Sequence, residues 1–166
     1  LGLFVTVTGS TTSQCTREVP CSFGRAIALA STTRPHIYMG PGSYTSQTWD
    51  INKSAKIFGG YDNSWVRRAR SNVFNQTRIY GGTTGVEGNA VTLLLSGAGN
   101  TIELYDLYLH GMNASGTYNG NGRSTYVVHV TDASLVVERA DVIAGNGAGG
   151  AAGNNGSSAS GTAAAS

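Results

Sequence analysis

Short segments of alternating apolar and polar residues recur along this chain, and glycine, proline, serine or asparagine bounds each of them. In the first segment, Leu3, Val5 and Val7 fall on one face of an extended chain, and Gly9 follows. A period of two predicts a half-buried β-strand, because successive side chains of a strand point to opposite faces. The same reasoning predicts further short strands at residues 36–39, 49–51, 55–58 and 77–80.

Residues 22–30 have helical periodicity instead. Phe23, Ile27 and Ala30 recur at the spacing of one helix face, and Ser22 stands where it can cap the first turn. So short a helix is unstable alone, and its small residues suit packing over the open end of a sheet structure. We therefore interpret residues 1–31 as an N-terminal cap. Gly24 costs this helix up to ~1 kcal/mol, which a need for close packing would explain.

Two later segments repeat each other at an offset of 33 residues, and each ends near a glycine. In both, the alternation breaks once and resumes, as a corner between two faces of a coil requires. The Gly-Gly pairs that follow residues 55–58 and 77–80 recur in the same manner. Strands that return to one stacked position predict a parallel β-helix, or β-solenoid. The matched residues are Ile102, Leu104, Leu107 and Leu109, then Leu135, Val137, Ala140 and Val142.

The composition agrees with a turn-rich, all-β protein. Glycine occupies 24 of the 166 positions, and charged residues make up 12% of the chain. One β-helix domain is expected over residues 1–145, followed at 146–166 by a tail of glycine, alanine, serine and asparagine, interpreted as a flexible linker. The net charge of +2 does not indicate a broad basic surface for nucleic-acid binding, and no run of apolar residues is long enough for membrane insertion.

Cys15 and Cys21 are the two cysteines of the chain, and they lie six positions apart in a loop rich in threonine and serine. No histidine or further cysteine lies near them to complete a zinc site. We expect a disulfide, which would contribute on the order of 2 kcal/mol by closing this short loop. A disulfide implies an oxidising compartment, whereas two unpaired thiols would imply nothing about location.

Candidate catalytic groups are few and scattered. The offset of 33 residues places Asp106 beside Arg139, and we interpret the two as an exposed ion pair between neighbouring coils. His36, His110 and His129 lie in or beside strands with no serine, cysteine or acidic motif around them, so outward polar positions explain them. The sequence therefore predicts no catalytic residue, no metal ligand and no cofactor.

Aromatic and basic residues cluster around the turn at residues 59–62. The arginines of this cluster either lie in a solvated loop, with the aliphatic parts of their side chains covering the apolar edge of a coil, or bind an acidic glycan together with the neighbouring aromatic residues. Both interpretations stay open at this point. The residues of this candidate glycan surface are Trp49, Tyr61, Trp65, Arg67, Arg68 and Arg70.

Four segments in the first half of the chain resemble the N-terminal coils of the pectin-lyase-like superfamily. They are the strand at 4–10, the helix start at 20–27, the Gly-Pro-Gly turn within 37–44 and the Gly-Gly-Tyr-Asp turn within 57–62. Their order is especially similar to that in large secreted or surface proteins of bacteria. The resemblance implies a right-handed parallel β-helix, a bacterial source and a secreted or cell-surface location. Polysaccharide lyases of this superfamily generally combine acidic Ca²⁺ ligands with an arginine or lysine base in a groove, and its hydrolases use grouped aspartates. The acids of this chain are few and scattered.

No apolar residue larger than alanine follows Ile143, so no C-terminal cap is evident from the sequence. An uncapped coil exposes its core and unpaired strand edges, and we expect further chain, a cap within the tail or another subunit to cover them. Copies that stack end to end would form an open filament. We therefore expect a non-catalytic structural module of an extracellular or cell-surface protein, either an adhesin or a fibre subunit. The alternatives are a polysaccharide lyase or glycoside hydrolase, and a glycan-binding module.

Overall fold

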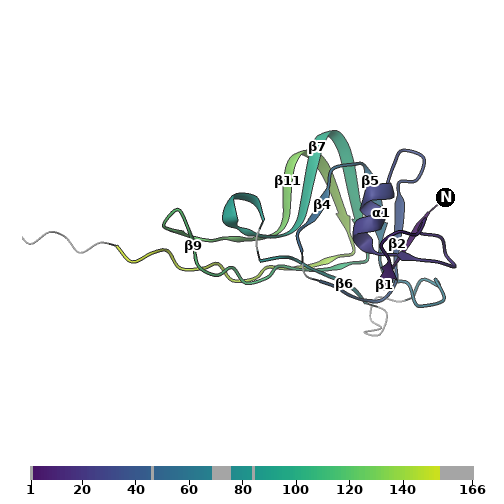
Figure 1. The fold of residues 1–166 in the computed structure, drawn as a ribbon, viewed down its shortest axis with the longest axis horizontal. Helices are drawn as coiled ribbons and strands as arrows, with labels where there is room; N and C mark the ends of the chain where they lie inside the picture. Colours follow the sequence, from purple (N-terminus) through teal and green to yellow (C-terminus); the bar gives the residue numbers. More distant parts are fainter. Residues whose placement is uncertain (1, 46, 69–75, 84, 154–166) are drawn as a thin grey trace, which may run out of the picture.

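The computed structural model describes residues 2–45, 47–68, 76–83 and 85–153 (Figure 1). Its strands wind into a β-solenoid of about four turns, as the sequence pattern predicts. The larger sheet stacks its strands in the order β1-β2-β5-β7-β11, with β4 also paired to β7, and the smaller sheet has the order β3-β6-β8-β12. Every pairing in these two sheets is parallel.

The strands of the larger sheet are β1 (Leu3–Ser10), β2 (His36–Met39), β4 (Trp49–Ile51), β5 (Ala55–Phe58), β7 (Ala90–Tyr105) and β11 (Thr125–Glu138). Those of the smaller sheet are β3 (Gly42–Tyr44), β6 (Thr77–Tyr80), β8 (Tyr108–His110) and β12 (Asp141–Ile143). A short hairpin of β9 (Thr117–Tyr118) and β10 (Asn121–Gly122) projects from the coils, and η2 (Val86–Gly88) is a single 3₁₀ turn. The predicted strands at 36–39, 49–51, 55–58 and 77–80 are confirmed, whereas β1 is three residues longer than predicted.

The register confirms the 33-residue repeat. Leu135 pairs with Ile102 and Val137 with Leu104 between β11 and β7, and Val142 pairs with Leu109 between β12 and β8. The break in alternation is a corner at which Asp106 (φ 55°) and Arg139 (φ 51°) both adopt the left-handed conformation. Such a residue turns the chain within one position, so the next inward side chain is reset onto the new face.

Inward side chains of successive coils stack into one apolar column. Residues that pair with one another on adjacent strands share what we call a ladder position. One ladder position contains Leu3 of β1, Ile37 of β2, Ile57 of β5 and Leu104 of β7. All four side chains are fully buried. Burying one such side chain contributes roughly 1.5–3 kcal/mol, so the column is the main source of stability.

The cap consists of α1 (Phe23–Leu29) and the loop that precedes it. Ser22 accepts a hydrogen bond from the backbone N–H of Arg25 at 3.3 Å, and Phe23, Ala26 and Ile27 are buried. The predicted helix is thus confirmed to within one residue at each end. A side-chain carbon added at Gly24 would meet its nearest neighbours at 3.8 Å or more, so close packing does not explain this glycine.

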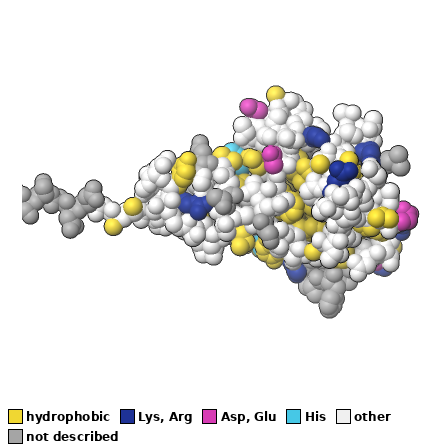
Figure 2. Space-filling view, viewed as in Figure 1, with side chains coloured by type: hydrophobic (Ala, Val, Ile, Leu, Met, Phe, Trp, Pro, Cys, Tyr) yellow, Lys and Arg dark blue, Asp and Glu magenta, His cyan; other side chains and the backbone are white. Residues whose placement is uncertain are grey.

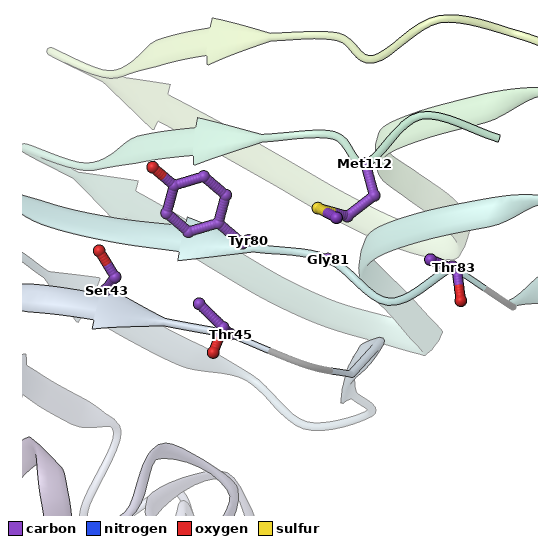
Figure 3. Close-up of a pocket in the computed structure, with 6 residues that line it drawn as sticks. All are labelled: Ser43, Thr45, Tyr80, Gly81, Thr83 and Met112. Carbon is purple, nitrogen blue, oxygen red and sulfur yellow. The ribbon is translucent and has the colours of Figure 1, made fainter.

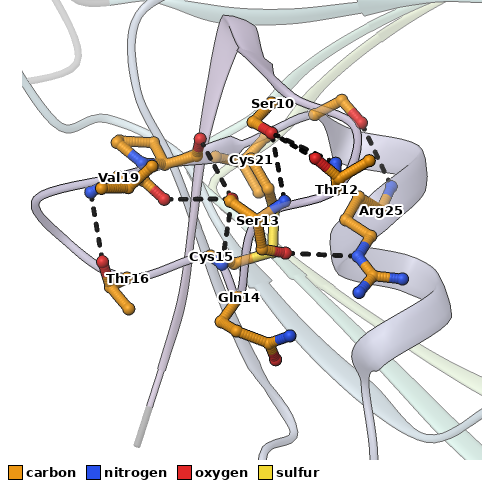
Figure 4. The surroundings of a disulfide bond; sticks show 12 residues. Ser10, Thr12, Ser13, Gln14, Cys15, Thr16, Val19, Cys21 and Arg25 are labelled. Carbon is orange, nitrogen blue, oxygen red and sulfur yellow. Dashed lines mark hydrogen bonds between the residues drawn. A yellow bond between two sulfur atoms is a disulfide. The ribbon is translucent and has the colours of Figure 1, made fainter.

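The predicted disulfide between Cys15 and Cys21 is confirmed, and it lies within the loop between β1 and α1 (Figure 4). Both cysteines are fully buried. The carbonyl of Cys15 accepts a hydrogen bond from the backbone N–H of Phe4 at 2.9 Å, and Cys21 bridges to β1 at Val5 and Ser10. The disulfide therefore joins the two ends of a loop that closes the outer edge of β1.

The first part of the glycine-rich tail lies along the hairpin of β9 and β10. The backbone N–H of Ala148 donates to Arg123 at 2.8 Å, and that of Ala151 donates to Gly120 at 3.0 Å. A side chain at Gly122 would clash with the carbonyl of Ala148, so the close approach requires glycine there. Residues 154–166 of the predicted linker lie outside the described part of the chain. No helix among the described residues is long and apolar enough to cross a membrane.

Candidate functional site

In the last coil, formed by β11 and β12, some side chains are exposed although the residues paired with them in the preceding coil are buried in the core. Leu104 is fully buried, but Val137 at the same ladder position is 43% exposed. Leu109 is likewise fully buried, and Val142 opposite it is 54% exposed. The change reflects position alone, because these valines point along the same column as the leucines. We call the surface formed by Tyr126, Val128, Val130, Leu135, Val137 and Val142 the end face.

Strand edges surround the end face. β11 pairs with β7 and β12 pairs with β8, and within the described residues no strand occupies the other side of either. The exposed edge of β11 is 14 residues long. Natural proteins usually protect such edges with charges, proline or a covering segment, since an open edge pairs readily with another chain.

The tail does not cover the end face within residues 144–153. Asn146 accepts from the backbone N–H of Ala114 at 2.8 Å and so directs the chain along the hairpin. Figure 1 shows this segment leaving the body beside β9 rather than crossing back over β11. The C-terminal end of the coils is therefore open in the described structure, whereas the N-terminal end is capped.

A second feature is an outward column of aromatic rings on the larger sheet. Phe4, Tyr38, Phe58 and Tyr105 occupy one ladder position on β1, β2, β5 and β7. Neighbouring ring centroids are 5.3, 5.5 and 4.9 Å apart, and the last two rings are nearly parallel, at 8°. The first pair is tilted and the other two are stacked, and these ring contacts between neighbouring strands stabilise the coils.

Tyr61 and Trp65, two residues of the predicted glycan surface, lie together beside this column. With Phe4, Tyr38 and Arg17 they line a shallow hollow of about 320 Å³. The ring of Trp65 meets that of Phe4 edge-on at 4.9 Å, and Tyr61 meets Tyr38 edge-on at 5.6 Å. Partial burial raises the pKa of Tyr61 above its ordinary value, so its hydroxyl stays protonated at neutral pH. Arg17 was not evident from the sequence, because the cap loop brings it here from a distant position.

The arginines of the predicted surface are already paired with acids. Arg67 forms an ion pair with Asp106, and Nε of Arg68 lies 2.7 Å from Oδ2 of Asp62. The backbone N–H of Val66 is the main reason that the pKa of Asp62 lies below its ordinary value, and Arg68 also lowers it. The carboxylate is therefore charged at neutral pH and fixes the loop. Arg70 lies outside the described residues.

Trp49 does not join this group. It is only 7% exposed, its ring packs against Phe23 at 4.8 Å, and its Nε1 donates to the carbonyl of Tyr80 at 3.3 Å. The alternating pattern places Trp49 on the inward face of β4, so its ring belongs to the core beneath the cap. We therefore leave it out of the glycan surface.

Asp106 and Arg139 do meet across neighbouring coils, with Nε of Arg139 2.8 Å from Oδ1 of Asp106. The expectation that this pair is exposed is wrong for the acid, which is only 8% exposed. Arg67 reaches the same carboxylate from the loop after β5. Two arginines thus neutralise one buried acid at a corner, an arrangement that holds the loop against the coils.

A further hollow of about 500 Å³ lies on the outer face of the smaller sheet (Figure 3). Small side chains at Ser43 and Thr45 leave space beside the ring of Tyr80, whose other face stacks on His110 at 4.8 Å. Burial is the main cause that lowers the pKa of His110, which keeps this imidazole neutral at pH 7. The hollow is open and carries no carboxylate among its lining residues.

The charged groups that the described structure brings together form ion pairs, among them Lys56 with Glu103, Arg68 with Asp62, and both Arg67 and Arg139 with Asp106. Figure 2 shows lysines, arginines and acids dispersed over the visible face of the body. Within residues 2–45, 47–68, 76–83 and 85–153, no group of three or more histidine, cysteine or acidic side chains could hold a metal ion. The histidines at 36, 110 and 129 lie on three different strands.

Comparison of the chain with family models, curated proteins and solved structures finds no match. The resemblance to the pectin-lyase-like superfamily therefore stays a prediction.

Proposed function

We propose that this protein is a non-catalytic structural module of an extracellular or cell-surface protein, an adhesin or fibre subunit, and that the end face is its assembly surface. The observation that carries the proposal is the exposure of core positions in the last coil, with Val137 43% exposed opposite a fully buried Leu104. The buried disulfide supports an oxidising, extracytoplasmic setting.

The energetics favour covering this surface. Monomeric proteins rarely leave a continuous apolar patch at an open strand edge, because water contact with each large apolar side chain forgoes roughly 1.5–3 kcal/mol. Docking would bury several such side chains at once and pair the free backbone groups of β11. Coils that each contact only their neighbours form a quasi-one-dimensional scaffold, which suits a structural role.

We expect the purified chain to form assemblies larger than a monomer. Replacing Val137 and Val142 together by lysine places two charges on the end face and is expected to abolish assembly. Both side chains are largely exposed, so the monomer should still fold. Sedimentation velocity over a range of concentrations, with electron microscopy of the same samples, measures the assembly.

The matched control replaces Val7 and Val19 by lysine. These valines are 48% and 56% exposed but belong to β1 and the cap loop. Assembly should persist in this variant. A wild-type chain that stays monomeric at every concentration, or assemblies unaffected by the end-face lysines, would contradict the proposal.

A second candidate function is glycan binding at the aromatic hollow beside β1. The observation that favours it is the convergence of Phe4, Tyr38, Tyr61 and Trp65 with Arg17 around one concave surface. Aromatic rings suit the apolar faces of sugars, and the guanidinium group of Arg17 offers donors for a carboxylate or hydroxyl. Such binding is compatible with a role as an adhesin.

Trp65→Ala tests this second function. On a panel of neutral and acidic polysaccharides, the variant is expected to lose at least tenfold in affinity, which corresponds to about 1.4 kcal/mol of binding free energy. Tyr118→Ala is the control, because Tyr118 is an exposed aromatic residue on the distant hairpin. Equal binding by wild type and Trp65→Ala would eliminate this hollow as a glycan site.

A further inference from the structure

We propose that the partner of the end face is the end face of a second copy of this chain, joined about a two-fold axis with the β11 edges antiparallel. This inference rests on the proposed function, because it names the occupant of the same assembly surface. It differs from end-to-end stacking into an open filament, since two copies joined through their last coils form a closed dimer, which fits the adhesin rather than the fibre subunit of the proposed function.

The first argument is the composition of the β11 edge. Residues 125–131 read Thr-Tyr-Val-Val-His-Val-Thr, with no Asp, Glu, Lys or Arg and no glycine or proline. A two-fold axis brings each strand against itself, so any charge near the axis would meet its own copy and repel it. This stretch carries no such repulsion, and its β-branched residues favour strand pairing.

The second argument is the fit of the side chains. In an antiparallel pair centred on Val128, Tyr126 of one copy would lie opposite Val130 of the other. All three residues occupy ladder positions that are buried one coil earlier, where Val91, Leu93 and Leu95 are at most 1% exposed. The pair would therefore close a continuous apolar core between the two copies, with mixed parallel and antiparallel pairing.

The third argument is that the opposite end offers no complementary edge. The outer side of β1 is occupied by the disulfide loop, through bridges from Cys21 to Val5 and Ser10, and α1 packs over the core. A head-to-tail contact would place this cap against β11 and leave the β11 backbone groups without strand partners. A second last coil supplies those partners.

The chain's own residues 154–166 are a poorer occupant on chemical grounds. They consist of asparagine, glycine, serine, alanine and threonine, and none has an apolar side chain larger than that of alanine. Covering Val130, Val137 and Val142 requires larger apolar groups than these.

Cross-linking distinguishes the orientations. The native cysteines form a disulfide and no cysteine among the described residues is free, so a single added cysteine reacts selectively. His129→Cys places a thiol on β11 one position from Val128, where the proposed axis lies, so the thiols of two copies come within reach of a short linker. Thr11→Cys places one on the cap loop. A short bismaleimide is added to each variant by itself and to a mixture of the two variants. One variant is labelled with ¹⁵N, so that mass spectrometry identifies the mixed products.

The proposal predicts covalent dimers of His129→Cys with itself, none of Thr11→Cys with itself and no mixed product. Adding Val130→Lys to His129→Cys should abolish the dimer. Mixed products as the main species would overturn the two-fold arrangement, while the end face would remain an assembly surface. No product in any sample, together with a monomeric sedimentation coefficient, would overturn both this inference and the proposed function.

Discussion

Leu104→Ala is expected to lower the free energy of unfolding by about 2–5 kcal/mol, because it removes a fully buried side chain and leaves a cavity in the column. Val137→Ala, at the same ladder position one coil later, is expected to cost about 1 kcal/mol or less in the monomer. The contrast follows from exposure, since neighbouring atoms surround Leu104 on all sides and Val137 on one.

Urea denaturation of both variants at low protein concentration measures this contrast. Dilution keeps the chain monomeric, so contacts between copies do not add to the result. Equal losses for the two variants would mean that Val137 is buried in solution. The end face would then be covered within a single chain, and the assembly proposal would fail.

Asp106→Ala is expected to lower the free energy of unfolding by about 3 kcal/mol. The substitution leaves Arg67 and Arg139 without their shared partner. Both arginines are half-exposed and can be solvated, so this part of the loss is about 2 kcal/mol, below the range for a pair whose remaining charge is buried. It also places alanine in a left-handed conformation, at φ 55°, which adds roughly 1 kcal/mol.

Asp132→Ala separates the two contributions. Asp132 has the same φ of 55° but is exposed at the corner of β11. Its loss should therefore be about 1 kcal/mol, the backbone contribution alone. Asp106→Asn should fall between the two alanine variants, because asparagine tolerates the left-handed conformation but carries no charge. If Asp106→Ala and Asp132→Ala cost the same in thermal or urea denaturation, the paired arginines contribute nothing to stability.

Much of the fold could be predicted because a solenoid repeats its own pattern. Each strand buries alternate residues against the previous coil, so the strand at 36–39 and the pairing of residues 102 and 135 follow from hydrophobic spacing. The cap helix and the disulfide could also be predicted, because local signals determine both: Ser22 at the helix start and two cysteines in one short loop.

The parts that could not be predicted depend on contacts between distant segments. The sequence pairs Asp106 with Arg139 but gives no sign of Arg67, which arrives from a loop whose path is not periodic. The burial of Trp49 depends on where the cap helix lies over β4. Arg17 reaches the aromatic hollow only because the disulfide loop folds back against β1. The Nη2 atom of Arg17 donates a hydrogen bond to the carbonyl of Ser64 at 2.9 Å.

The glycine-rich tail shows a limit of composition as a guide. Its small residues indicate a flexible linker, yet residues 146–151 donate and accept backbone hydrogen bonds along the hairpin. Glycine at 122 and 145 permits that approach, since a side chain at either position would clash with backbone atoms of the facing segment. The same composition therefore serves close packing of backbones as well as flexibility.

Hydrogen–deuterium exchange of the native chain at low and high concentration tests the central claim most directly. If the last coil is the assembly surface, the backbone amides of residues 125–131 will become more protected as concentration rises, while those of β5, buried between β2 and β7, will not change. Protection of residues 125–131 that does not depend on concentration would contradict the account, because the edge of β11 would then have no intermolecular partner.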